Sequence, residues 1–235
     1  KEEKVQINSL LNGAATKAAV LEAIKLECRK ATPGSQVFFF FSGVGENKAH
    51  GREEAAILLY DYVAESSTGS ILESEFREQV DAFLPEGAGI TLVFDTSSGG
   101  KHWVSASKPS QFIYNATDFD QGGQASPNGG LLSRAFRQVV SDVGASHFTH
   151  IGLMQRLRSL MPSLSNGNEQ IATWYGHKDQ QTAPFLNLPA PSSLRLREFM
   201  VDTALARSVG TVDVQEILQQ FQTDYAIPEH LSVEK

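Results

Sequence analysis

The sequence predicts an α/β fold in which a mostly parallel central sheet carries helices on both faces, as an α-β-α sandwich. Two observations support this prediction. Apolar runs of strand length occupy residues 36–41, 55–60 and 90–94. Amphipathic segments of helix length, residues 16–30 and 73–84, alternate with these runs along the chain. Such an alternation is typical of βαβ units, whose strands form a parallel or mixed sheet.

The two predicted helices have recognisable starts and ends. Residues 16–30 carry apolar side chains at spacings of three and four, and Thr16 is a suitable N-cap. The dipeptide Pro33-Gly34 ends this segment. Residues 73–84 place apolar side chains on one face and are followed by Pro85. Both segments are therefore expected to pack one face against the sheet.

The run at residues 36–41 is apolar and rich in Phe, as expected for a strand that is buried on both faces. A polar, Gly-rich loop is expected to follow it, up to residue 53. The runs at residues 55–60 and 90–94 each end at an aspartate, Asp61 and Asp95. We expect these segments to be the second and third strands.

The C-terminal half is expected to continue the same pattern. Strands are predicted at residues 111–116 and 173–176, and helices at residues 131–143 and 149–160. Beyond Pro189-Ala190-Pro191 the sequence changes character, and two further helices are predicted at residues 193–209 and 212–225. We therefore predict a domain over residues 1–190 and a C-terminal helical extension over residues 191–235.

Composition excludes several classes of function. The net charge is −7 and no cluster of Lys or Arg stands out, which argues against a nucleic-acid-binding protein. No apolar run approaches the length of a membrane span, and residues 1–4 do not resemble a signal peptide. The single cysteine, Cys28, excludes an intrachain disulfide and fits a core position on a helix. A cytoplasmic location is the expectation.

Polar residues follow two of the predicted strands. Ser42 comes directly after residues 36–41, and Asp95 directly after residues 90–94. Ligand sites of open α/β sheets form at the carboxyl ends of the strands. These two positions are therefore candidates for a functional site, although an aspartate at a strand end often only caps the following turn.

Two segments resemble the metacaspases. Residues 38–45 (FFFFSGVG) are similar to the strand and loop that read FFYFSGHG in this family, and residues 93–100 (VFDTSSGG) are similar to its DSCHSG segment. Weaker similarities in the same order extend the resemblance over roughly residues 8–188. The resemblance implies the caspase-haemoglobinase fold. The first strand of that fold has no counterpart here, and because a sheet without it would expose strand edges, we expect it to be supplied in another way.

The departures from the family pattern affect its chemistry. The resemblance implies a His base and a Cys nucleophile at the positions of Val44 and Ser97, and a second His at Ser98. Val44 has no group that could accept a proton, and a serine hydroxyl requires a base. Ser42 and Asp95, in contrast, match residues that line the family's acidic pocket for an Arg or Lys side chain.

We therefore expect a catalytically degenerate caspase-like domain that acts as a binding or regulatory module and retains, by resemblance, a pocket for a basic side chain. The alternative is an endopeptidase that cleaves after Arg or Lys, represented here by an inactivated mutant or by a Ser97-dependent variant. In that variant His50 or His102 would be the base, oriented by Asp61 or Asp118; these histidines are otherwise solvated loop residues. A third hypothesis is a structural subunit whose pocket is vestigial.

The expected partners are a protein or peptide, such as an active caspase-like homologue, an Arg- or Lys-containing segment, or a second copy of the chain. The resemblance associates the domain with programmed cell death. No cofactor or metal is expected from the residues, because His147 and His150 lack an evident third ligand. Calcium is implied by the family resemblance alone. Neither nucleic acid nor membrane is expected as a partner.

Overall fold

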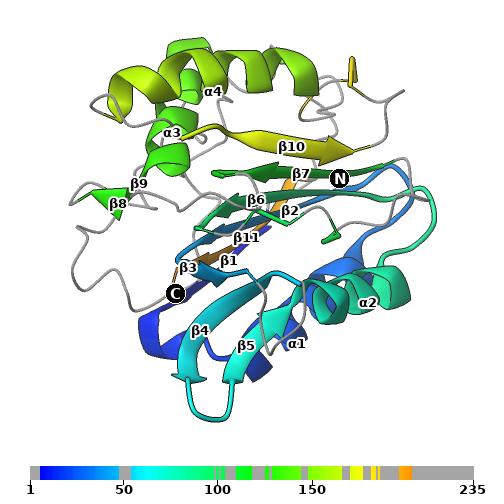
Figure 1. The fold of residues 1–235 in the computed structure, drawn as a ribbon. Helices are drawn as coiled ribbons and strands as arrows, with labels where there is room; N and C mark the ends of the chain where they lie inside the picture. The colour runs from blue at the N-terminus through cyan, green and yellow to red at the C-terminus, as the bar shows by residue number, and fades with distance from the viewer. Residues whose placement is uncertain are drawn as a thin grey trace.

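The computed structural model describes residues 6–47, 54–97, 99–100, 102–103, 110–117, 125–126, 129–143, 148–165, 170–176, 181–183, 185 and 196–202. A six-stranded sheet lies between two layers of helices (Figure 1). Its strands follow the order β1-β11-β2-β6-β7-β10, and all neighbours are parallel except β7 and β10. The predicted fold class, a mostly parallel α/β sandwich, is confirmed.

The sheet strands are β1 (Gln6–Leu11), β2 (Gln36–Ser42), β6 (Gly89–Asp95), β7 (Gln111–Asn115), β10 (Thr173–Gly176) and β11 (Leu196–Asp202). The helices are η1 (Asn12–Ala14), α1 (Lys17–Lys30), α2 (Glu73–Phe83), α3 (Leu131–Val143) and α4 (His150–Leu164). A second, antiparallel sheet contains β3 (Val44–Glu46), β4 (Ala56–Val63) and β5 (Thr68–Leu72). The short strands β8 (Ala125–Ser126) and β9 (Gly129–Gly130) form a two-stranded ribbon. None of the helices in the described part of the chain combines the length and apolar character needed to cross a membrane.

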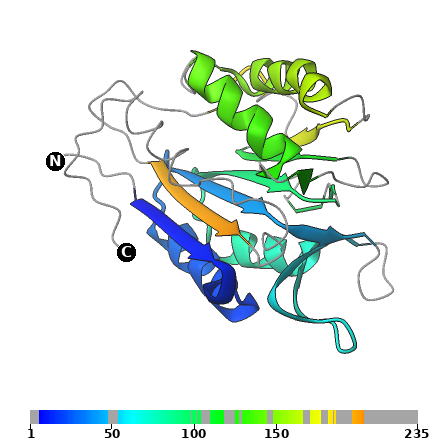
Figure 2. The same ribbon diagram turned by 90° about the vertical axis from the view of Figure 1, so that its left-hand side faces the viewer.

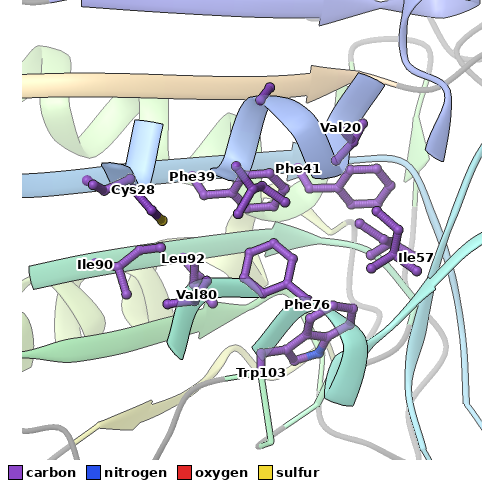
Figure 3. Packing of buried hydrophobic residues seen from close by; sticks show 14 of the residues in the cluster. Val20, Cys28, Phe39, Phe41, Ile57, Phe76, Val80, Ile90, Leu92 and Trp103 are labelled. Atoms are coloured by element: carbon purple, nitrogen blue, oxygen red, sulfur yellow. The ribbon is translucent and has the colours of Figure 1, made fainter. Parts of the chain in front are cut away.

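Alternation along β2 divides the apolar core into two layers. Phe39 and Phe41 point to the layer covered by α1 and α2, where they pack with Phe76 and Trp103 (Figure 3). Phe38 and Phe40 point to the opposite layer, which α3 and α4 cover. Since successive strand side chains face opposite sides, an all-apolar run is the pattern that a strand buried on both faces requires.

The predicted helix starts are largely confirmed. Thr16 caps α1, accepting a hydrogen bond from the backbone N–H of Ala19 at 3.3 Å. Thr149 does the same for α4 through the N–H of Gly152, at 3.1 Å. The buried positions of α1 include Val20 and Ile24, as the spacing predicted. These local signals were readable because capping and amphipathic spacing involve residues within one helical turn.

One prediction about a strand needs correction, and some strands were not predicted. Residues 56–63 form a strand, as expected, but it lies in the small antiparallel sheet and not in the main one. The sequence also gave no separate prediction for β1, β3 or β5. Neighbouring hairpin strands can pair locally without entering the main sheet, and an apolar run does not reveal which sheet it joins.

The prediction of a helix over residues 193–209 is wrong for residues 196–202. These residues form β11, which lies between β1 and β2 and is parallel to both (Figure 2). The sheet position that had no expected occupant is thus filled by the C-terminal part of the same chain. The second helix predicted there, residues 212–225, lies outside the described residues.

Candidate functional site

Strand register brings the predicted site residues Ser42 and Asp95 side by side. They are register partners at the carboxyl ends of β2 and β6, and the backbone N–H of Gly43 donates to the Asp95 carbonyl at 3.2 Å. Asp202, the last residue of β11, is in register with Ser42 on the other side. Three strand ends therefore meet at one edge of the sheet, where ligand sites of such folds form.

The carboxylate of Asp95 faces the start of α3. It accepts hydrogen bonds from the backbone N–H of Ser133 at 2.8 Å and from the Ser133 hydroxyl, and the N–H of Leu132 also donates to it. These N–H groups belong to the first turn of the helix, which has no intrahelical acceptors and favours an anion. Asp95 thus accepts the hydrogen bonds of N–H groups in the first turn of α3, although it lies on a strand that is far away in the sequence.

Burial has the largest effect on the pKa of the Asp95 carboxyl. Its exposed fraction is 6%, and removal from water raises the pKa of its carboxyl, while the hydrogen bonds from Ser133 and Leu132 act in the opposite direction. Gly130 lies against the carboxylate so closely that a Cβ there would overlap both Asp95 oxygens. The carboxylate is therefore enclosed by the β9–α3 junction, on the side where its hydrogen bonds are made.

Ser97 and Val44 are also close to one another. The Ser97 hydroxyl donates a hydrogen bond of 2.9 Å to the carbonyl oxygen of Gly45, the residue after Val44 in β3. Val44 itself is partly buried and pairs with Leu58 of β4. A carbonyl oxygen accepts this hydrogen bond but is not a base of useful strength. Among the described residues, the hydrogen-bond partner of the Ser97 hydroxyl is thus a backbone carbonyl.

Two of the residues considered as helpers for Ser97 make hydrogen bonds elsewhere. His102 is exposed; its backbone N–H donates to Glu73 Oε2 at 3.3 Å and its backbone carbonyl accepts from Arg77 at 3.0 Å, both at α2. Asp61 accepts from the backbone N–H of Lys17 at the start of α1, at 2.9 Å. His50, Asp118 and Ser98 lie outside the described residues.

The loop that carries Ser97 is bonded to its surroundings by residues that the sequence pattern does not mark as functional. Thr117 donates to the carbonyl of Thr96 at 3.3 Å, and Asn115 donates to the carbonyl of Gly100 at 3.1 Å. Glu73 is buried at the start of α2, close to Gly100, and burial raises the pKa of its carboxyl. In the sequence, the position of Glu73 at a predicted helix start was the one feature that could have pointed to this residue. Ser133 and Gly130 had no such feature, because they contact Asp95, which is far from them in the sequence.

The histidine at the start of α4 is a core residue. His150 is 3% exposed, its ring stacks on Phe112 at 3.5 Å between centroids, and its Nδ1 lies 2.5 Å from the Tyr114 hydroxyl. Burial lowers the pKa of His150 to about 3. Within the described residues no three His, Cys, Asp or Glu side chains form a group that could hold a metal ion. His147 lies outside them, so the predicted lack of a metal site stays a prediction.

Comparison with known families finds a match to the N-terminal part of the chain. Residues 1–103 match the family model described as the metacaspase, peptidase C14 domain. No curated protein matches the sequence significantly.

Among solved structures, the protein GSU0716 from Geobacter sulfurreducens is similar, with a TM-score of 0.56 and 13% identity. The similarity covers 80% of each chain. At this identity it concerns the fold alone. The first 103 residues are thus similar to the metacaspase, peptidase C14 domain, and the mostly parallel sheet between two helical layers is consistent with the fold of such a domain.

Proposed function

We propose that this caspase-like domain does not cleave peptide bonds and acts as a binding or regulatory module. The observation that carries the proposal is the hydrogen bond from the Ser97 hydroxyl to the Gly45 carbonyl, beside a valine that cannot accept a proton. Activation of a serine requires a base within hydrogen-bonding distance of its hydroxyl. Among the residues that the structure describes, the group at that distance is a backbone carbonyl.

The only cysteine does not provide an alternative nucleophile. Cys28 lies on α1 with no exposed surface, and it packs in the core layer formed with α2 (Figure 3). A buried thiol in apolar surroundings is inert, because reactivity belongs to an accessible thiolate. The proposal therefore includes no cysteine-dependent cleavage.

Recognition of a basic side chain is the finer part of the proposal, and it rests on the family resemblance of Ser42 and Asp95. In the structure the Asp95 carboxylate already accepts hydrogen bonds from Ser133. A guanidinium or ammonium group would have to share this carboxylate or displace α3 from it. Binding through Asp95 is therefore expected to be weak and to alter the start of α3.

The experiment is a turnover assay with fluorogenic peptides that end in Arg or Lys, with and without calcium. We expect no turnover by the natural sequence. Val44→His with Ser97→Cys replaces the two degenerate positions by a base and a thiol, and a gain of activity by this double variant, but by neither single variant, is the expected result.

Turnover by the natural sequence that is lost in Ser97→Ala would overturn the proposal and favour the serine peptidase. Loss of such turnover in His50→Ala or His102→Ala would then identify the base. Calorimetric titration of the same peptides separates the remaining cases. Binding that is weakened by Asp95→Asn supports a basic pocket, whereas no binding favours a structural subunit.

A further inference from the structure

Helix α2 binds the backbone of His102 from two sides. The N–H of His102 donates to Glu73 Oε2 at 3.3 Å, and its carbonyl oxygen accepts from Arg77 Nη1 at 3.0 Å. Glu73 and Arg77 are four residues apart, so both side chains lie on the same face of α2. Trp103, the next residue of the chain, packs against the same helix (Figure 3). The loop that carries Ser97 is therefore held at its far end by α2.

The Glu73 carboxyl is buried and has no cation bound to it. Glu73 is 3% exposed, and none of the ion pairs within the described part of the chain includes it. Two backbone N–H groups, those of His102 and Ala55, donate to the carboxyl. A buried carboxylate without a charge partner is costly, and burial raises the pKa of Glu73 above its ordinary value of 4.5. The closed loop therefore favours the neutral carboxyl.

The charged groups around this carboxyl act in opposite directions. The imidazole of His102, on the loop, lowers the pKa of Glu73, and the carboxylate of Glu54, just before β4, raises it. Arg77, one turn further along α2, donates to the His102 carbonyl. Because burial has the largest effect, the pKa of Glu73 remains raised in their presence.

The indole of Trp103 lies beside the same carboxyl. A Cβ on Gly100 would lie 2.3 Å from Trp103 Nε1 and 2.5 Å from Glu73 Oε2, so both atoms contact the loop at one face of this glycine. Trp103 is 1% exposed, and its Nε1 has no hydrogen-bond partner among the residues that the structure describes. The indole thus adds no third donor to the carboxylate, and its position makes it a natural reporter of the charge on Glu73.

We propose that Glu73 is a proton-operated latch: the loop that carries Ser97 is held most firmly over the neutral carboxyl, and ionisation of Glu73 loosens the loop from α2. A proton that is bound more tightly in the closed than in the open loop favours closure below pH 4.5, and this preference is lost as pH rises through the closed-state pKa. Since the loop also bonds to Gly45 through Ser97, its opening changes the candidate site. The inference does not depend on whether that site cleaves or binds peptides.

Hydrogen exchange of the His102 amide measures this opening directly, because its N–H donates to Glu73. Protection factors of the full chain, corrected for the intrinsic effect of pH on exchange, are compared between pH 4.5 and pH 8. We expect the protection factor to fall as Glu73 ionises, by at most about tenfold per pH unit because one proton is involved, and then to level off. Trp174→Phe leaves Trp103 as the only tryptophan, and its fluorescence should change with the same midpoint.

Two variants on α2 identify the group that titrates. Glu73→Gln is neutral and of similar shape, and it should keep the protection of His102 high at every pH. Glu75→Gln removes a carboxylate that is paired with Lys17 at 2.7 Å, so it should leave the pH dependence unchanged. Both variants retain Asp95, and a pH dependence caused by that carboxyl would persist in Glu73→Gln.

A third variant tests whether the loop opens as a unit. Ser97→Ala removes the hydrogen bond from the loop to Gly45, so it should lower the protection of His102 at pH 8. Equal protection in Ser97→Ala and in the natural sequence would confine the opening to residues next to α2 and overturn the latch.

Protection of His102 that stays constant or rises with pH would overturn the proposal. The same pH dependence in Glu73→Gln would also overturn it, because another group would then be responsible. If Glu73→Gln does not fold, the scan of the natural sequence and the Trp103 fluorescence decide together. A fluorescence step without a matching fall in protection would show that Glu73 titrates without moving the loop, and would count against the latch.

Discussion

The Asp95 carboxylate at the end of β6 accepts hydrogen bonds from both the backbone N–H and the hydroxyl of Ser133 at the start of α3. A residue that the family resemblance assigns to a ligand pocket therefore contacts a helix of its own domain. This relationship gives the most direct tests of how the candidate site is built.

Asp95→Ala should lower the free energy of unfolding by about 1–3 kcal/mol, because buried N–H groups at the start of α3 lose their acceptor. Ser133→Ala removes the hydroxyl bond only and should cost about 0.5–1.5 kcal/mol. Urea denaturation measures both values. Equal stability of the natural protein and Asp95→Ala would show that the contact contributes nothing.

The stability contribution of Asp95 should depend on pH. Burial raises the pKa of this carboxyl in the folded state above 3.8, so the folded state holds its proton to a higher pH than the unfolded state. The folded state is then favoured below pH 3.8, and this gain is lost as pH rises through the folded pKa. The stability of the natural protein relative to Asp95→Asn should accordingly increase on acidification from neutral pH. A difference that stays constant or decreases would contradict this.

Gly130→Ala should destabilise the protein more than Gly13→Ala does. The added methyl group at residue 130 would overlap the Asp95 carboxylate, whereas at residue 13 its nearest contact is the Tyr60 ring at 3.7 Å, an ordinary packing distance. We expect the first change to cost about 1–3 kcal/mol, as overpacking in a filled interior does. Thermal unfolding of the two variants provides the comparison, and similar midpoints would indicate that Asp95 can move freely.

His150 should make the protein sensitive to acid. Burial lowers the pKa of His150 to about 3, against 6.5 for the unperturbed group, so its contribution to stability is fully present above pH 6.5 and is lost as pH falls towards 3. The expected slope is at most about 1.4 kcal/mol per pH unit in this window. His150→Phe should flatten the dependence of unfolding free energy on pH, whereas Tyr114→Phe, which keeps the imidazole, should retain it. An unchanged slope in His150→Phe would assign the acid sensitivity to other groups.

Ser97→Ala should lower stability by about 0.5–1.5 kcal/mol, because the hydroxyl is a structural donor to Gly45. Nuclear magnetic resonance shifts of the Gly45 and Glu46 amides would report the lost contact. Ser163→Ala, at an exposed position of α4, removes a local hydroxyl bond to the Leu160 carbonyl with little expected cost and is the control. A loss of stability in Ser163→Ala as large as that in Ser97→Ala would argue against a specific structural role for the Ser97 hydroxyl.

The local part of the candidate site was predictable from the sequence. Ser42 and Asp95 follow apolar runs, and strands of such runs in a parallel sheet end at the same edge. The similarity of residues 38–45 and 93–100 to the metacaspase segments located Val44 and Ser97. Neither pattern contains information about what the side chains contact, so the bonds from Ser97 to Gly45 and from Ser133 to Asp95 could not be predicted.

The sequence by itself determined the fold class, helices α1 to α4 and the apolar strands β2, β6, β7 and β10, because periodicity, caps and turn residues act over a few neighbouring positions. Only the tertiary structure decided that residues 196–202 form a strand between β1 and β2, and that Asp95 binds the start of α3. Both depend on register and packing between segments far apart in the chain, whose backbone and burial partners exist only once the sheet has formed. For this reason a segment with a helical pattern became the strand that completes the sheet.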